Sequence, residues 1–117
     1  MRATIEDIAR AFSGHDFEAI YPYLADDATW SVVGDEELAG KEAITRACDR
    51  LAADLAGVRT DFRRFRALVG GDWVVVESLA DYTDREQQVS VVASCDIYDF
   101  RDGMLAAITS FNVALSP

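Results

Sequence analysis

Several residue types that mark specialised proteins are scarce in this chain. Its 117 residues include two cysteines, two prolines and one histidine. Cys48 and Cys95 are far apart in the sequence, and neither belongs to a CxxC motif or has a nearby histidine that could complete a metal site. We therefore expect no metal site and two buried free thiols, because an unpaired cysteine behaves as a small hydrophobic residue.

Long apolar runs and positive charge are also scarce. No run approaches the roughly 20 apolar residues that a membrane span needs, and the first ten residues carry acidic groups where a signal peptide needs an apolar segment. We therefore expect a cytoplasmic protein with no membrane partner. The chain has 21 acidic and 11 basic residues, for a formal net charge of -10. This charge repels a phosphate backbone, so nucleic acid is not an expected partner.

What is present predicts one α+β domain covering residues 1–117. Apolar residues recur at helical spacing near residues 4–13, 16–24 and 41–55, and Pro22 should shorten or kink the second helix. The later part of the chain alternates like strands. Strands are expected near residues 28–33, 58–69, 73–83, 87–100 and 104–113, with a polar loop at 34–37. Helices followed by an antiparallel sheet indicate helices packed on one face of that sheet.

The alternation within the strands separates an apolar face from a mixed one. Between residues 89 and 97 the odd positions are apolar, whereas Asp96 occupies an even position. In the preceding strand Val74 and Val76 are opposed by Glu77 and Asp81. From the residues alone, the apolar face would pack on the helices and the three carboxylates would face water.

Three segments, in their order and spacing, resemble a known family. They are LADDATW at residues 24–30, LAGKEAI at 38–44 and VVASCDIYDFRDGMLAAITSF at 91–111. The chain resembles the nuclear transport factor two superfamily over nearly its whole length, and most of all its SnoaL-like and ketosteroid isomerase-like branch. The resemblance implies a single SnoaL-like domain with a cystatin-like, cone-shaped fold. Three N-terminal helices would close over a strongly bent antiparallel sheet, with a largely apolar pocket between them.

The resemblance also reverses the expected orientation of the sheet. It implies that the mixed face lines the pocket and that a second subunit covers the apolar face in a homodimer. The expected outer residues are Val74, Val76, Val89, Val91, Leu105 and Phe111. The pocket would hold a hydrophobic small molecule. Its expected contacts are Tyr21, Leu24, Trp30, Leu79, Tyr98 and Ile108 as walls, and Ser94, Ser110 and Asn112 as polar groups. Ordinary core packing is the alternative role for the aromatic residues.

Asp96 is the first catalytic candidate. It falls where the resemblance places the oxyanion-hole aspartic acid of ketosteroid isomerases, a carboxyl group kept protonated by an apolar site. Asp81 and Glu77 are the next candidates, because carboxylates that share a cavity raise one another's pKa. The general-base and tyrosine positions of those isomerases fall near Val32 and Ile8, which cannot transfer protons. True steroid isomerase activity is therefore not expected.

Two other related activities lack their residues. Limonene epoxide hydrolases use an Arg-x-Asp pair and a last-strand aspartate, where this chain has Leu79-Ala80-Asp81 and Ser110. Scytalone dehydratase uses a histidine and an aspartate, but His15 lies in a predicted loop and is expected to be exposed. The alternating arginines at 59–66 are expected to form a solvated strand face rather than an anion site.

The remaining relatives, the SnoaL-type cyclases, rely on one acid/base carboxylate in an apolar cavity. The expected function is therefore proton transfer without a cofactor, as in an aldol cyclase or isomerase, on a hydrophobic carbonyl compound. The alternative is a non-catalytic dimeric module of the same fold that binds a ligand or assembles with a partner.

Overall fold

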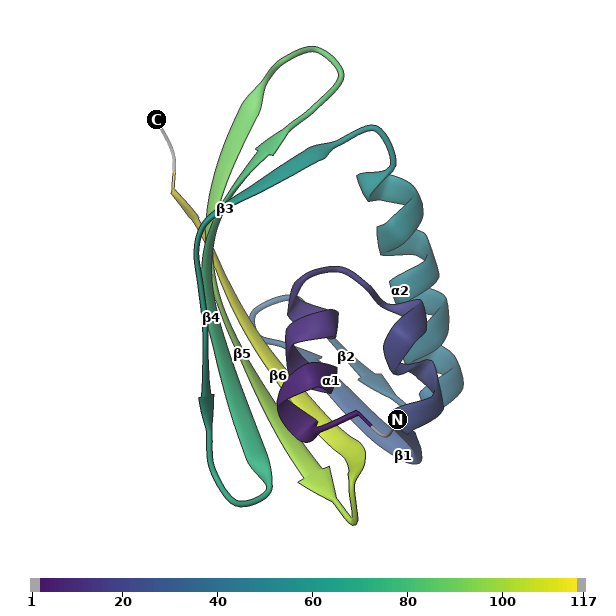
Figure 1. The fold of residues 1–117 in the computed structure, drawn as a ribbon. Coiled ribbons are helices and arrows are strands. Elements are labelled where there is room, and N and C mark those ends of the chain that lie inside the picture. The colour runs from purple at the N-terminus through teal and green to yellow at the C-terminus, as the bar shows by residue number, and fades with distance from the viewer. Residues whose placement is uncertain (1–2, 116–117) are drawn as a thin grey trace.

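A strongly curved six-stranded sheet forms one wall of the molecule, and the helices occupy its concave side (Figure 1). The computed structural model describes residues 3–115. Within this part of the chain the predicted helices and strands occur in the predicted order, with one additional short strand before the third helix. The α+β class and the bent sheet covered by N-terminal helices are confirmed, and the sheet is not closed into a barrel.

The first helix, α1 (Ile5–Ser13), begins at a capping box. The backbone N–H of Asp7 donates to Thr4 Oγ1 at 3.1 Å, and the N–H of Thr4 donates to Asp7 Oδ2 at 3.1 Å. These bonds satisfy donors that the first turn leaves free. The helix buries Ile8, Ala9 and Phe12 against the sheet side, as its spacing predicted.

Two further helices complete the concave layer. The short 3-10 helix η1 (Glu18–Tyr23) contains Pro22, which explains why the predicted second helix does not continue as a regular α-helix. Helix α2 (Lys41–Leu55) has the predicted bounds and buries Ile44 and Cys48. None of the helices described is long and apolar enough to cross a membrane.

The strands run in the spatial order β2-β1-β6-β5-β4-β3. Their neighbours are antiparallel except for the parallel pair β1 and β6, a departure from the predicted all-antiparallel sheet. Alternation within a strand carries no information on its partner, so this pair could not be read from the pattern. The predicted loop at 34–37 also contributes to a strand. The strands are β1 (Leu24–Val32), β2 (Glu36–Ala39), β3 (Arg59–Val69), β4 (Trp73–Thr83), β5 (Val89–Arg101) and β6 (Met104–Leu115).

Strand register decides which side chains share a face. Asp96 of β5 stands opposite Val76 of β4 and Ser110 of β6, and these three residues lie on the inner, concave face. Glu77 stands opposite Cys95, so both lie on the outer, convex face. No helix among residues 3–115 covers the convex face of β3, β4 and β5 (Figure 1).

Half of the residues predicted for the outer face of the sheet lie in the core instead. Val74, Val76 and Leu105 are fully buried in the core beneath the helices, not on the outer face. On β4 the apolar positions are the inner ones, opposite to the expected parity. A register shift beside Phe100 places Leu105 inside and Phe111 outside although both are odd-numbered. Val89 and Phe111 are exposed, and Val91 is partly exposed.

The two cysteines lie in different environments. Cys48 is buried in the core, where burial raises the pKa of its thiol to about 12. Cys95 is only partly buried on the outer face, which corrects the expectation of two buried thiols. The prediction failed for Cys95 because the odd positions of β5 face outward. Among residues 3–115, no cluster of three or more histidine, cysteine, aspartate or glutamate side chains could hold a metal ion.

Candidate functional site

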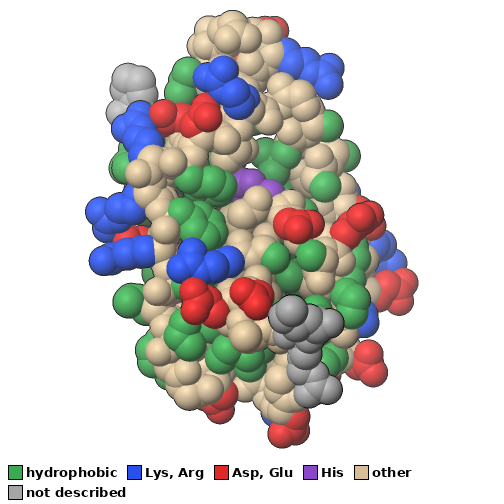
Figure 2. Space-filling model, viewed as in Figure 1, with side chains coloured by type: hydrophobic (Ala, Val, Ile, Leu, Met, Phe, Trp, Pro, Cys, Tyr) green, Lys and Arg blue, Asp and Glu red, His purple; other side chains and the backbone are tan. Residues whose placement is uncertain are grey.

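A cavity of about 250 Å³ lies between the helices and the inner face of the sheet. On the surface, the histidine side chain, coloured purple, lies in a recess beside hydrophobic side chains, coloured green (Figure 2). The cavity draws residues from both layers of the fold. Its lining comprises Phe12, Ser13, His15, Phe17, Trp30, Leu51, Leu55, Ser78, Tyr82, Val92, Ser94, Asp96, Ser110 and Asn112.

The sheet supplies a polar strip to this cavity. Ser78, Ser94 and Asn112 stand side by side across β4, β5 and β6, and Ser94 Oγ donates to Asn112 Oδ1 at 2.8 Å. Ser110 accepts a hydrogen bond from Trp30 Nε1 at 2.9 Å, which fixes the indole against the sheet. The helical side is largely apolar. The cavity can therefore hold a hydrophobic molecule with one polar edge turned toward the sheet.

Asp96 projects from β5 into a chain of hydroxyl groups. Ser13, the last residue of α1, donates its hydroxyl to Asp96 Oδ2 at 2.8 Å. The same Ser13 Oγ lies 2.5 Å from the hydroxyl of Tyr98, which is fully buried. A serine hydroxyl has a single proton, so Tyr98 donates to Ser13 when Ser13 donates to Asp96. The termination of α1 thus places a hydrogen-bonded hydroxyl directly on the carboxylate.

Burial raises the pKa of Asp96 above its ordinary value, because a desolvated carboxyl group favours its neutral form. The nearby hydroxyls of Ser110, Ser13 and Tyr98 oppose this shift, and so does His15. Among the described residues, no lysine or arginine forms an ion pair with Asp96. Desolvation therefore outweighs the stabilisation of the charged form.

His15 is only partly exposed and lines the cavity, which corrects the prediction of an exposed loop residue. Its Nε2 lies 3.3 Å from the Tyr82 hydroxyl. Burial lowers the pKa of His15, and the negative charge of Asp96 opposes that shift. The prediction failed because a loop that directly follows a buried helix can fold back over the same core.

Five of the predicted contact and catalytic residues meet in the cavity. They are Asp96, Trp30, Ser94, Ser110 and Asn112. Other predicted contacts lie elsewhere: Leu24 and Ile108 are buried in the core, and Tyr98 lies behind Ser13. Tyr21 points toward α2, where its hydroxyl donates to Asp49 at 2.7 Å.

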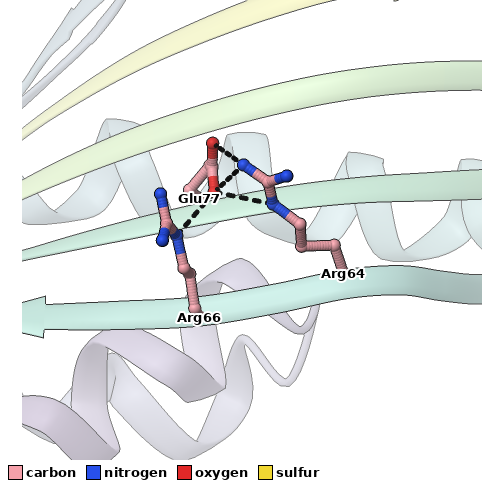
Figure 3. Close-up of polar contacts among 3 residues, drawn as sticks. All are labelled: Arg64, Arg66 and Glu77. Carbon is pink, nitrogen blue, oxygen red and sulfur yellow. Dashed lines mark hydrogen bonds and ion pairs between the residues drawn. The ribbon is translucent and has the colours of Figure 1, made fainter.

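Glu77, Asp81 and Leu79 lie on the outer face of the sheet and are not brought to the cavity with Asp96. Glu77 receives hydrogen bonds from Arg64 and Arg66 (Figure 3), and chiefly its bond with Arg64 lowers its pKa. The prediction that Glu77 and Asp81 share the cavity with Asp96 is thus corrected. Both faces of β4 carry polar side chains, so the mixed face could not be identified without the strand register.

Asp81, like Glu77, is paired with an arginine of β3. Arg63 Nη2 lies 2.7 Å from Asp81 Oδ1, and Arg63 Nε lies 3.0 Å from Oδ2. The arginines of β3 thus form a paired, solvent-exposed strand face, as the sequence predicted.

Most of the lining residues that sequence reasoning missed come from the helices or from the inner positions of β4 and β5. The alternation of β4 and β5 already places Ser78, Tyr82 and Val92 on one face once the register is known. For the helical residues, periodicity predicts burial but does not distinguish a core position from a cavity wall. These missed helical residues are Phe12, Ser13, Leu51 and Leu55.

Comparison with known proteins agrees with this architecture. A family model described as the SnoaL-like domain matches residues 5–108. An NTF2-like protein of unknown function from Cytophaga hutchinsonii has 27% sequence identity and a TM-score of 0.80, with 91% of this chain and 93% of that chain covered. A search of curated proteins finds no match.

Two solved structures with lower identity share the fold. A candidate polyketide cyclase from Xanthomonas campestris has 19% identity and a TM-score of 0.72, with 92% of this chain and 85% of that chain covered. An LEH-like epoxide hydrolase from Mycobacterium tuberculosis has 18% identity and a TM-score of 0.64, with 93% and 79% covered. At these identities the likeness establishes the fold alone, and any argument about chemistry must come from the residues of the site.

Proposed function

The chain belongs to the SnoaL-like domain family, and we propose that it binds a hydrophobic carbonyl compound and transfers protons on it. The reaction class is that of an aldol cyclase or isomerase, with Asp96 as the acid/base or as the group that donates a hydrogen bond to the oxyanion. Its likeness to a candidate polyketide cyclase supports this class.

The observation that carries the proposal is the environment of Asp96. Its carboxyl group borders a largely apolar cavity, accepts a hydrogen bond from Ser13, and has a raised pKa because it is buried. A carboxyl group with raised proton affinity can be protonated when it meets the substrate and can donate to a carbonyl oxygen. The outer carboxylates differ in this respect, since arginines hold Glu77 in its charged form.

The chemical step is enolisation. Asp96 donates its proton to the carbonyl oxygen while a base takes a proton from the adjacent carbon, whose C–H electrons become the new carbon–carbon double bond. Return of a proton to another carbon isomerises the compound, whereas attack of the enol carbon on a second carbonyl closes a ring. Protons alone move to and from the protein, so the step requires no redox cofactor.

The cavity walls support this chemistry in two ways. The aromatic and leucine side chains exclude water and favour one orientation of a flat, apolar substrate. The strip formed by Ser78, Ser94 and Asn112 offers polar contacts along one edge. Such orientation matters most for cyclisation, because two parts of one flexible molecule must be held close together.

Hydrogen–deuterium exchange of 2-tetralone, a small hydrophobic ketone, tests the proposal. Wild-type protein should accelerate exchange of the protons next to the carbonyl in deuterated buffer, followed by proton NMR. Asp96→Asn should lose about 100-fold or more of this acceleration. Glu77→Gln is the matched control, because that carboxylate lies on the outer face, and it should exchange at the wild-type rate. An Asp96→Asn variant as fast as wild type would overturn the proposal.

The outer face supports a second element of the proposal, a homodimer. We define the outer patch as Leu79, Ala93, Cys95, Phe111, Val113 and Leu115, which line a shallow apolar depression. Although the chain carries a net charge of -10, the carboxylate of Glu77 beside this patch is balanced by Arg64 and Arg66. Two copies can therefore meet there without strong charge repulsion. If the cavity proves inactive, a dimeric ligand-binding module is the alternative function.

A further inference from the structure

We propose that His15 is the second proton-transfer group of the cavity, acting as the base that removes the proton next to the carbonyl while Asp96 donates to the oxygen. This inference rests on the proposed function and assigns its missing base. The proposed step sends the carboxyl proton of Asp96 to the carbonyl oxygen and leaves the acceptor of the carbon-bound proton unassigned. A second group at the cavity lining can take that proton while Asp96 acts only as the acid.

The backbone holds His15 in an uncommon conformation. Its φ angle is 72°, in the left-handed region that is unusual for residues other than glycine. Gly14 precedes it with a φ of -85°, so the chain does not use its glycine at the left-handed position. The conformation is anchored, since the N–H of His15 donates to the Phe12 carbonyl at 3.0 Å and the N–H of Asp16 donates to the Ala11 carbonyl at 2.8 Å. Uncommon backbone conformations that the surroundings hold in place are frequent at functional sites.

The imidazole is enclosed by three aromatic rings. Its centroid lies 5.9 Å from that of Phe17, 5.9 Å from that of Phe62 and 5.8 Å from that of Tyr82. These rings come from different parts of the chain: Phe62 belongs to β3, Tyr82 to β4, and Phe17 lies just before η1. They leave the ring at the cavity lining while removing much of its water.

The hydrogen bond with Tyr82 suits a base. A neutral imidazole has one N–H and one acceptor nitrogen. If the Tyr82 hydroxyl donates to Nε2, the proton of the ring lies on Nδ1; if Nε2 donates instead, Nδ1 is the free acceptor. In the second arrangement Tyr82 fixes the tautomer and leaves Nδ1 able to accept a proton from the substrate. Burial also raises the pKa of the Tyr82 hydroxyl, so Tyr82 is suited to hydrogen bonding and not to acting as the base.

The charges of the cavity support the same division of roles. Burial lowers the pKa of His15 and raises that of Asp96, which brings the proton affinities of the two groups closer together. A pair that carries one proton contains one acid and one base, as enolisation requires. The proton leaves carbon for the imidazole, the carboxyl proton goes to oxygen, and the C–H electron pair forms the enol double bond. Return of both protons restores the pair.

His15 is the only histidine of the chain, so its imidazole signals are unambiguous in NMR spectra. The experiment uses wild type, His15→Gln, Asp96→Asn and the outer-face control Glu77→Gln. Three quantities are measured for each variant. They are 2-tetralone exchange as a function of pH, binding of 2-naphthol as a mimic of the enol, and, where the histidine is present, its imidazole titration.

We expect His15→Gln to bind 2-naphthol within about twofold of wild type but to lose about 100-fold or more of the exchange rate. The exchange rate of wild type should follow a bell-shaped dependence on pH, because one acid and one base are needed. The limb that reports the base should be missing in His15→Gln. The imidazole signals should move when 2-naphthol binds, and Asp96→Asn should lower the pKa of His15 by removing the neighbouring negative charge. Glu77→Gln should leave all three quantities unchanged.

Exchange at the wild-type rate in His15→Gln would overturn the role of His15, and a slow Asp96→Asn variant would still support the proposed function. Absence of exchange in wild type would instead overturn the proposed function and, with it, the assignment of His15 as a base. Imidazole signals that 2-naphthol does not move would contradict the placement of His15 in the ligand site. A merely structural role would appear as lost 2-naphthol binding and a lower melting temperature in His15→Gln, and would also overturn the inference.

Discussion

The two faces of the sheet treat the same chemical group in opposite ways. On the outer face Glu77 lies within 2.8 Å of two arginines, and its pKa is lowered chiefly by the hydrogen bond with Arg64. On the inner face Asp96 has a serine hydroxyl and a nearby histidine in place of arginine, and burial raises its pKa. Register makes Glu77 the neighbour of Cys95, so the two carboxylates belong to adjacent positions of paired strands. Environment, and not residue type, separates a solvated ion from a candidate acid.

This contrast follows from which layer covers each face. The helices remove water from the inner face and border the cavity, whereas no helix in the described part of the chain covers the convex side of the sheet (Figure 1). Polar side chains on the inner face must therefore satisfy one another, as Ser13, Tyr98 and Asp96 do. Those on the outer face pair with long, exposed arginines. The following variants test how far this difference extends.

The largest effect is expected for truncation of the inner face. Leu105→Ala removes a fully buried side chain from the core and should lower the free energy of unfolding by about 2–5 kcal/mol. Leu68→Ala is the matched control on the outer side of the edge strand β3, where the side chain is 52% exposed. It should change stability by less than about 1 kcal/mol. Urea unfolding measures both, and equal losses would contradict the assignment of the two faces.

The next effect concerns association through the outer patch. Phe111→Asp places a charge in the lining of the apolar depression and should weaken the proposed dimer more than tenfold, because burial in the interface would desolvate this charge. Val33→Asp is the control, since Val33 is also exposed but lies in the turn after β1. Sedimentation equilibrium measures the association constant. A wild-type protein that stays monomeric, or a Phe111→Asp variant that associates normally, would contradict the dimer.

A smaller effect is expected for the buried hydroxyl chain. Tyr98→Phe removes the group that pairs with Ser13 in the core and should cost about 0.5–1.5 kcal/mol of stability. Tyr21→Phe is the control, because its hydroxyl bonds Asp49 at an exposed position and should cost less. The loss of Tyr98 should also raise the pKa of Asp96 further, because this hydroxyl opposes the effect of burial. Carbon-13 NMR of the Asp96 carboxyl group detects that change. An unaltered pKa of Asp96 would contradict the influence of the Tyr98 hydroxyl on the site.

The fold could be predicted from the sequence because each element depends on a local pattern. The spacing of Ile8 and Phe12 defined α1, and period-2 alternation defined the long strands. The site was predicted only in part. The alternation of β5 placed Asp96 and Ser94 on one face, and the family resemblance turned that face inward. Glu77 was misplaced because relating β4 to β5 requires their register, which neither strand encodes alone. His15 was missed because loop geometry depends on the packing around it.

The smallest and most specific difference between the faces is the sign of their pH dependence. The pKa of Asp96 is raised in the folded protein, so the native state binds more protons than the unfolded state between the unfolded and folded pKa values. Its contribution to stability is therefore lost as pH rises through this window. The pKa of Glu77 is lowered, so its contribution is present above the unfolded pKa and is lost as pH falls through the folded value.

The two carboxamide variants should thus change stability in opposite directions with pH. Asp96→Asn should gain stability relative to wild type as pH rises from 4 to 7, because wild type must ionise a desolvated carboxyl group and the variant does not. Glu77→Gln should lose stability relative to wild type at lower pH, as pH rises from the lowered folded pKa of Glu77 to its unfolded value, because only wild type gains a carboxylate beside Arg64 and Arg66. Urea unfolding at several pH values measures both differences. Parallel pH dependence in the two variants would show that the faces share one electrostatic environment, and would remove the physical basis for treating Asp96 as an acid.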